Sequence, residues 1–278
     1  LGLSVREAAV GMIRLTNANM VTALKLISVQ RGYDPRDFSL VAFGGGGAMH
    51  AAALAEELRI GQVIIPVEPA VFSAWGMLMS DLRRDVIQTH IVRADRVEPE
   101  TINGIWEELE HELKRFLAAE GFSDADIQVS RRVEMRYVGQ EHTVNLAFPS
   151  GPVSRATLEE VGARFNDQHE HLYTYKLDAA TEFVNFHAAV TAPVVKPLPP
   201  RIEARGPEAP AQRGSRQVHF DQWGVLETPI FERSALGAGA SLDGPLIVEE
   251  PASTTVVFPG QKLRVDDWGN LLITIGAR

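Results

Sequence analysis

The stretch SLVAFGGGGAMHAAALAEELRI, from Ser39 to Ile60, decides the fold of this chain. It holds four consecutive glycines, Gly44, Gly45, Gly46 and Gly47. The apolar run before them predicts a buried strand at 39–43, and the pattern after them predicts a helix at 48–58. Four ordered glycines lose much conformational entropy, so a plain linker is not expected between two apolar elements. We therefore expect a backbone loop that a ligand approaches closely.

The segments on either side extend this loop into a larger unit. Residues 62–67 predict a second strand, so a helix joins two strands as in a βαβ unit, which favours a parallel pair. Ligands of such sheets bind beyond the carboxyl ends of the strands, where the glycines lie. Residues 4–30 predict a preceding helix, because Ser4 and Glu7 have the spacing of a capping box.

Composition limits the classes of function. The chain has 278 residues, of which 45% are apolar and 23% charged, the ordinary balance of a globular protein with one or two cores. It has no cysteine, which excludes disulfides and thiolate metal sites and fits a reducing, cytoplasmic location. The net charge is −9 without a basic stripe, so we expect no nucleic acid partner. No apolar run approaches the roughly 20 residues that span a bilayer, so we expect no membrane partner.

Changes of pattern predict four regions. Residues 1–82 carry the α/β unit, and residues 83–195 mix strands and helices without a regular repeat, which predicts an α+β domain. Residues 196–215 are rich in proline, glycine and charge, as expected of an extended linker. Residues 216–278 show short strand patterns between turn residues, which predict a small β-rich carboxyl-terminal domain.

Two interpretations of the glycines stay open. Successive glycine amides and a helix amino end can hold phosphate together, or the glycines can simply relieve crowding in a strand-to-helix turn. A Walker loop is excluded, because no Lys-Ser or Lys-Thr follows the glycines. A dinucleotide fingerprint is disfavoured, because Met49 or His50 stands where its third glycine belongs. Glu68, at the end of the second strand, is the one feature that supports it.

Several separated motifs resemble one family. They are YDPRDFSLVAFGGGGAMHAAALAEELRI at 33–60, VIIPVEPAVFSAWGMLMSDLRRD at 63–85, MRYVGQEH at 135–142 and GPLIVEEPASTTVVFPGQ at 244–261. In this order they are similar to the hydantoinase A/5-oxoprolinase family, which includes N-methylhydantoinase A and the ATPase subunits of acetone and acetophenone carboxylases. The resemblance is weakest across 153–215.

The resemblance implies a fold and a cofactor. Part of the chain is expected to form one lobe of an actin-like, hexokinase-like (ribonuclease H-like) ATPase, followed by α+β and β-rich domains. Residues 1–82 would then belong to the second lobe. Gly44, Gly45, Gly46 and Gly47 would form the turn beside ATP, with His50 in the first turn of the next helix. The acidic D-x-G-G-T loop of the first lobe does not occur here. We therefore expect a carboxyl-terminal portion with half of a nucleotide site, and Mg²⁺ held mainly by the missing amino-terminal lobe.

The resemblance also implies an activity and partners. Members of the family use ATP to open cyclic amides such as hydantoins and 5-oxoproline, usually together with a hydantoinase B-type subunit. We expect the same of this chain, with a small-molecule substrate, an oligomeric enzyme, and no activity of the chain by itself. A carboxylase-type ATPase subunit and a non-catalytic assembly module are the alternatives.

Few other residues suggest chemistry, and none is assigned a catalytic or metal-binding role. His50 is expected either to touch phosphate or substrate or to cap its helix, and Asn17 is an amide within an apolar helix that needs a partner. His169 and Tyr173 share a helix face and are expected to stack inside their domain.

Charged residues near strand ends also have purely structural interpretations. Arg136 lies near a predicted hairpin turn, where it could bind a carboxylate or pair with Glu134 or Glu141. Glu249 and Glu250 end a predicted strand and are expected to be solvated.

Overall fold

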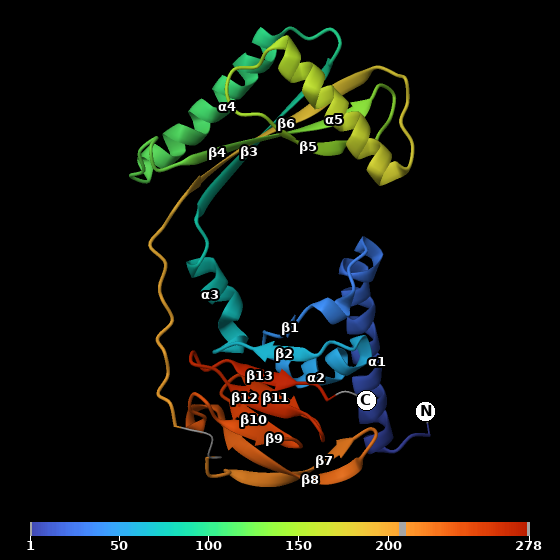
Figure 1. Ribbon diagram of the computed structural model, residues 1–278, viewed down its shortest axis with the longest axis vertical. Helices are drawn as coiled ribbons and strands as arrows, with labels where there is room; N and C mark the ends of the chain where they lie inside the picture. The colour runs from blue at the N-terminus through green and yellow to red at the C-terminus, as the bar shows by residue number, and fades with distance from the viewer. Residues whose placement is uncertain (1, 206–209, 277–278) are drawn as a thin grey trace. The chain divides into compact units, whose positions relative to one another are not determined.

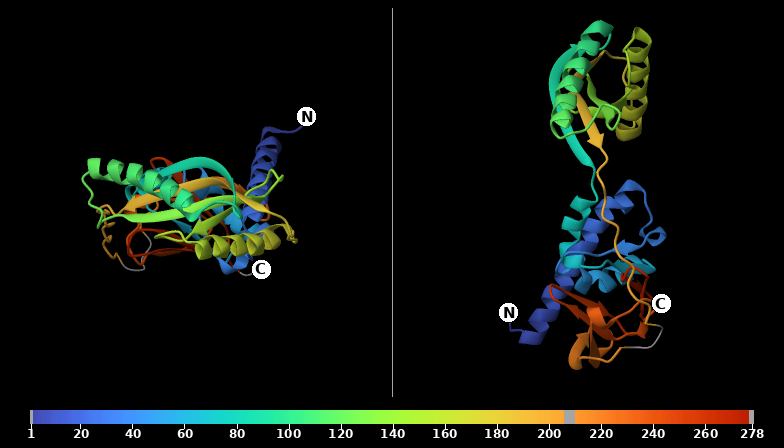
Figure 2. Two further views of the ribbon diagram at one scale, coloured as in Figure 1. Left: turned by 90° about the horizontal axis from the view of Figure 1, so that it is seen from above. Right: turned by 90° about the vertical axis from the view of Figure 1, so that its left-hand side faces the viewer.

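The structure, a computed structural model, describes residues 2–205 and 210–276. They form two compact units (Figure 1). Unit 1 takes in the chain up to Met79 and again from Pro197, whereas unit 2 is the continuous segment Ser80–Lys196. Two stretches of chain connect the units, one on the way into unit 2 and one on the way out (Figure 2). Unit 1 is therefore built from segments that are far apart in sequence.

The first segment of unit 1 contains the predicted strand–helix–strand unit. Helix α1 (Val5–Ile27) begins with the predicted capping box of Ser4 and Glu7. The elements β1 (Leu40–Val41), α2 (Gly47–Leu58) and β2 (Gln62–Ile65) follow. The strands β1 and β2 pair in parallel, which confirms the prediction, although both are shorter than their apolar runs. The remaining elements are η1 (Val29–Arg31), η2 (Pro35–Asp37), η3 (Pro69–Val71) and α3 (Phe72–Leu78).

One sheet joins the two segments of unit 1. Its strand order is β1-β2-β13-β12-β9, with β9 (Ser241–Asp243), β12 (Lys262–Val265) and β13 (Leu271–Thr274) from the second segment. Strand β13 pairs antiparallel with β2, so that Ile65 lies opposite Leu271. The described residues of 216–278, which we expected to form a domain of their own, therefore share a sheet and a core with the first segment.

A second sheet of unit 1 supports helix α2. Its order is β11-β10-β8-β7, with β7 (Gly214–Phe220), β8 (Gly224–Glu232), β10 (Leu246–Glu250) and β11 (Ser253–Val257), and η4 (Arg233–Ala235) follows β8. Strand β11 packs against α2. Helix α2 contributes small residues to the shared core, among them Ala48, Ala51 and Ala55, while β11 contributes Val257. Small side chains allow close approach, so β11 fixes the position of α2.

Unit 2 is a sheet with two helices. The antiparallel strands run in the order β3-β6-β4-β5, with β3 (Leu82–Arg93), β4 (Gln128–Tyr137), β5 (Val144–Phe148) and β6 (Thr181–Ala192). Helices α4 (Pro99–Ala119) and α5 (Arg155–Tyr173) cover the sheet (Figure 1). The core gathers around Trp106 of α4 and Phe186 of β6. The predicted hairpin is confirmed, because β4 and β5 pair on either side of Gly139.

The return from unit 2 to unit 1 contains little regular structure. Of the expected linker 196–215, residues 206–209 lie outside the described residues. Elsewhere in it, Ala204 forms an isolated bridge with Ala238, and β7 begins at Gly214. Among the described helices, none combines the length and the apolar character needed to cross a membrane.

Candidate functional site

The glycine loop, residues 42–46, connects the carboxyl end of β1 to α2. Gly44 has a φ of +86°, a left-handed conformation that favours glycine. Its amide donates to Pro69 O at 2.7 Å, and its carbonyl accepts from the Gly47 amide at 3.2 Å. The amides of Gly44 and Gly47 are therefore used inside the protein, where they build the turn.

The other two glycines, Gly45 and Gly46, have open amides. Within the described part of the chain neither amide has a hydrogen-bond partner, and both residues are exposed. A Cβ on Gly46 would meet no atom within 4 Å, and one on Gly45 would lie 3.4 Å from Ala252 O, an ordinary contact. Gly46 is the N-cap of α2, and no side chain caps the helix. The site therefore offers unpaired N–H groups together with the positive end of a helix dipole.

Two further turns border this loop. Pro69, which accepts from Gly44, follows Glu68 just beyond the carboxyl end of β2. Glu68 is exposed and has a φ of +50°, uncommon for a residue with a side chain. On the other side, Ala252 of the turn between β10 and β11 approaches Gly45. The carboxyl ends of β1 and β2 thus meet at the loop, as expected of a parallel pair.

A buried arginine holds the carboxyl end of β2. Nη2 of Arg233 donates to the carbonyl oxygens of Ile65 at 3.4 Å, Pro66 at 3.1 Å and Gly269 at 2.8 Å. Its Nη1 lies 3.4 Å from Glu250 Oε1, and the two side chains are only 13% and 7% exposed. The expectation that Glu250 is solvated is therefore wrong. The role of Arg233 could not be predicted from the sequence, because its partners lie in distant segments of the chain.

Burial dominates the electrostatics of this pair. Burial lowers the pKa of Arg233 and raises the pKa of Glu250, in each case against the attraction of the opposite charge. The nearby charge of Glu68 raises the pKa of Glu250 further. The Arg233–Glu250 pair therefore contributes to the stability of unit 1 mainly through the hydrogen bonds of Arg233 to the strand ends.

The substitution Glu250→Gln is expected to weaken the pH dependence of the stability of unit 1. Because the pKa of Glu250 is raised above its ordinary value of 4.5 in the folded chain, its contribution is complete below that pH and is lost as pH rises through the folded pKa. In urea unfolding the wild type should therefore lose part of its advantage over Glu250→Gln as pH rises above about 4.5. Glu249→Gln, whose side chain is 24% exposed, is the control. A difference between wild type and Glu250→Gln that stays constant with pH would contradict this.

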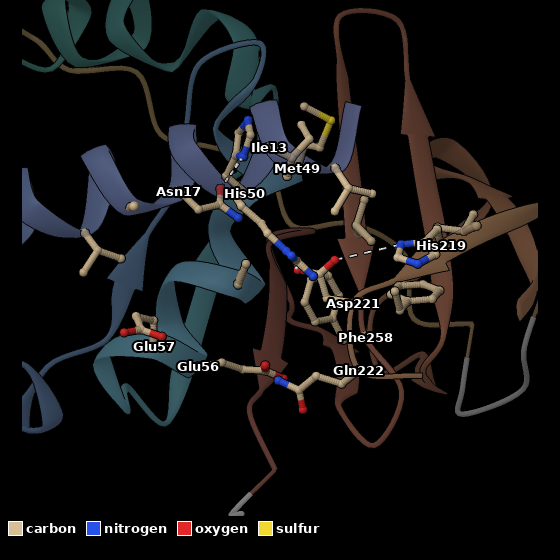
Figure 3. Close-up of a pocket in the computed structure, with 18 of the residues that line it drawn as sticks. Ile13, Asn17, Met49, His50, Glu56, Glu57, His219, Asp221, Gln222 and Phe258 are labelled. Atoms are coloured by element: carbon tan, nitrogen blue, oxygen red, sulfur yellow. Dashed lines mark hydrogen bonds and ion pairs between the residues drawn. The ribbon is translucent and has the colours of Figure 1, made fainter. Parts of the chain in front are cut away.

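His50 lies in the first turn of α2 but turns toward α1. Its Nδ1 lies 2.7 Å from Oδ1 of Asn17, and the residue is only 7% exposed. Both residues line a cavity of about 780 Å³ between α1, α2 and the turn from β7 to β8 (Figure 3). None of the four glycines lines this cavity, so the structure gives the glycines and His50 different surroundings. The side-chain amide of Asn17, which we expected to need a hydrogen-bond partner, therefore pairs with His50.

The residues singled out in unit 2 have structural roles. The rings of His169 and Tyr173 lie 4.7 Å apart, as predicted, and Nδ1 of the buried His169 lies 2.9 Å from Tyr175 O. Arg136 pairs with Glu182 at 2.8 Å, so the expected partners on its own hairpin are wrong. These groups are engaged with the protein itself.

Comparison with known families gives consistent matches along the chain. A family model described as hydantoinase/oxoprolinase matches residues 1–86, and one described as the hydantoinase/oxoprolinase C-terminal domain matches residues 93–273. An uncharacterised protein of Methanocaldococcus jannaschii is 36% identical over 98% of this chain and 38% of its own length. The caprolactamase subunit alpha of Pseudomonas jessenii is 32% identical over 99% of this chain and 40% of its own length. The chain thus spans about two fifths of the length of these relatives.

A solved structure matches the fold. The crystal structure of an ATP-dependent caprolactamase from Pseudomonas jessenii is 31% identical, with a TM-score of 0.79 over 100% of this chain and 41% of that one. Together with the helices and sheets described above, this match confirms the predicted fold class, a mixed α/β architecture consistent with an actin-like ATPase fold.

Proposed function

This chain belongs to the hydantoinase/oxoprolinase family, and from that premise we propose that it is the carboxyl-terminal portion of an ATP-dependent hydrolase of cyclic amides. In this proposal the chain contributes half of the nucleotide site through the glycine loop. The missing amino-terminal lobe closes the site, and a hydantoinase B-type subunit completes a cytoplasmic, oligomeric enzyme. The chain alone is then inactive.

The observation that carries the proposal is the pair of open amides at Gly45 and Gly46. They lie at the amino end of a 12-residue helix, without a partner within the described part of the chain and without a covering side chain. Backbone N–H groups at a helix amino end are well suited to phosphate oxygens, because no side chain must be ordered and the helix dipole favours negative charge. The residues present therefore fit the phosphate groups of ATP.

The described residues hold no ready-made metal site, and in this proposal Mg²⁺ is held mainly by the missing amino-terminal lobe. Among them, no group of three or more histidine or acidic side chains is arranged to hold a metal.

The proposed role of the chain is to bind and to orient. ATP, when bound, supplies a phosphoryl group that activates an amide oxygen of the substrate. Gly45 and Gly46 hold phosphate oxygens, and Gly44 keeps the turn closed through Pro69. Arg233 fixes the strand end from which Pro69 follows. His50 stands in the first turn of α2, but its side chain turns toward Asn17 of α1 and is given no part in holding phosphate.

A charge placed at Gly46 tests the phosphate role. Gly46→Asp is expected to weaken ATP binding by at least about 100-fold, because a carboxylate would take the place of a phosphate oxygen and repel the others. Asparagine has nearly the same shape as aspartate but no charge. Gly46→Asn is therefore expected to lose less than about tenfold in ATP affinity. Calorimetric titration of the natural gene product that contains this chain measures both, and thermal unfolding checks that both variants fold. Equal ATP affinity in the wild type and in Gly46→Asp would refute the nucleotide role.

The choice of substrate distinguishes the proposed activity from its alternatives. ATP turnover that depends on a hydantoin or a lactam supports the hydrolase. Turnover that requires a ketone and bicarbonate would show the carboxylase type. Turnover that is unchanged when this chain is omitted would show an assembly module.

A further inference from the structure

Strand β1 lies at one edge of the first sheet of unit 1, whose order is β1-β2-β13-β12-β9 (Figure 1). It pairs in parallel with β2 on one side, and within the described part of the chain no strand lies on its other side. The apolar run that predicted this strand spans residues 39–43, but only Leu40 and Val41 are in regular pairing. Strand β1 is thus shorter than its sequence pattern and has an open edge.

The backbone of β1 shows which groups face this open edge. The amide of Ala42 donates to Ile64 O at 3.0 Å, so Ala42 faces β2. In a parallel pair, alternate residues direct both their N–H and their C=O toward the same neighbour, so these groups of Val41 and Phe43 point to the open side. Within the described residues the amide of Phe43 has no hydrogen-bond partner, and Val41 and Phe43 are 46% and 47% exposed. The edge therefore presents free donors and acceptors to a further strand.

The outward face of the same sheet is apolar where a solvated face would be polar. Val41 lies opposite Ile64, and Ile64 lies opposite Leu272, so the three side chains form one row across β1, β2 and β13. The neighbouring row on the other face, which includes Val63 and Ile273, is 0% exposed. A sheet with one solvated face alternates apolar and polar residues, whereas a sheet covered on both faces is apolar on both. The pattern around β1 is that of a sheet inside a larger domain.

A groove of about 420 Å³ opens beside the amino end of β1. It lies between the end of α1, the connection 28–39 and the end of α2. Its walls include Ile27, Tyr33 and Phe38, which are 60%, 57% and 53% exposed, and Leu40 of β1 itself. Among the described residues that line the groove, none is charged. The groove therefore fits apolar side chains, and Leu40 joins it to the open edge.

We propose that β1 pairs along its open edge with a further strand, and that apolar side chains next to this strand fill the groove. The strand belongs to the part of the natural gene product that lies outside this chain. About three fifths of the length of the curated relatives has no counterpart in this chain, so a segment large enough to supply the strand is expected.

A second copy of the chain is the alternative occupant, and the edge does not favour it. Association of two copies costs translational and rotational freedom, which contacts along an edge of two residues would have to offset. A strand of the same polypeptide carries no such cost. The inference rests on the part of the proposed function in which this chain is a portion of a longer protein, and not on the nucleotide role of the glycine loop.

Hydrogen exchange resolved to single amides tests the pairing. The amide of Ala42 is the internal standard, because it is bonded to Ile64 whether or not the edge is covered. In the natural gene product without nucleotide, the amides of Val41 and Phe43 are expected to exchange within about tenfold of the rate of Ala42. Exchange at least about 100-fold faster than Ala42 would show an open edge and overturn the proposal. Protection that disappears on dilution would show a second copy and overturn it as well.

The variant Ile27→Asp tests the groove, and Ile87→Asp in β3 is the matched control, because both isoleucines are 60% exposed. A carboxylate in a filled groove would be buried without a partner. Ile27→Asp is therefore expected to speed exchange at Val41 and Phe43 at least about tenfold relative to Ala42, and Ile87→Asp should leave it unchanged. Thermal unfolding checks that both variants fold. Unchanged protection in Ile27→Asp would overturn the proposed filling of the groove.

Failure of this inference can be distinguished from failure of the proposed function. If ATP binds but the amides of Val41 and Phe43 exchange freely, the nucleotide role stands and the pairing is wrong. If these amides are protected but ATP does not bind, the pairing stands and the nucleotide role is wrong.

Discussion

Replacing Arg233 by methionine is expected to lower the free energy of unfolding of unit 1 by about 3–5 kcal/mol. The substitution keeps a long unbranched side chain but removes the donor shared by Ile65, Pro66 and Gly269. It also leaves Glu250 buried without its positive partner. Removing one member of a buried network costs far more than the network contributes as a whole, because the remaining groups stay desolvated and unpaired.

The surface pair of Arg216 and Glu249 supplies a matched control. Arg216→Met makes the same change at a side chain that is 51% exposed, and is expected to cost less than about 1 kcal/mol. Arg233→Lys should recover only part of the loss, because one ammonium group cannot reproduce the fork of a guanidinium. Hydrogen exchange in peptides that contain β2 and β13 reports the opening of unit 1 separately from unit 2. Equal protection in Arg233→Met and Arg216→Met would show that Arg233 does not hold the strand ends.

Replacing Trp106 by alanine is expected to lower the free energy of unfolding of unit 2 by about 3–5 kcal/mol. The residue is 0% exposed, and its ring centroid lies 5.1 Å from that of Phe148 and 5.4 Å from that of Phe186. The guanidinium of Arg131 lies 5.2 Å from the same ring. Alanine would leave a void between a helix and a sheet that cannot both move to fill it.

A smaller ring at position 106 distinguishes the contribution of packing from the cost of the unsatisfied hydrogen-bond donor. Within the described residues Nε1 of Trp106 has no partner, and an unsatisfied buried donor costs about 1–3 kcal/mol. Trp106→Phe removes that donor and keeps much of the ring, so it should cost less than half as much as alanine. Trp268→Ala, at a ring in unit 1 that is 44% exposed, is the control and should cost less than about 1 kcal/mol. Urea unfolding, followed by hydrogen exchange in α4 and β6, measures each loss. If Trp106→Ala and Trp268→Ala lowered the free energy of unfolding by similar amounts, the packing argument would be contradicted.

The sequence predicted those features that neighbouring residues determine. The capping box of Ser4 and Glu7, the parallel pair of β1 and β2 and the contact of His169 with Tyr173 depend on spacings within one segment. The predicted strand-to-helix turn was found for the same reason, since glycines interrupt the two apolar patterns and allow turn conformations such as the φ of +86° at Gly44.

Features that join distant segments could not be predicted in this way. Strand β13 completes the sheet beside β2, and four residues of alternating pattern give no indication of their partner. The burial of Glu250 follows from Arg233, which lies outside its strand. Likewise, the sequence cannot distinguish Gly44 from Gly45, because both are glycines in the same run. Only the position of Pro69 decides that the amide of Gly44 forms a hydrogen bond within the protein.

The pairing of Ile65 with Leu271 also has a consequence for synthesis on the ribosome. The two residues are about 200 positions apart, so at 5–20 residues per second about 10–40 s pass between their translation. During that interval Val63 and Ile65, both 0% exposed in the finished fold, lack the strand that will cover them. Unit 2 emerges as one continuous piece and can fold in the meantime. The nascent chain therefore carries an unpaired strand edge at β2 through much of its translation, and an unpaired edge is open to pairing with other chains.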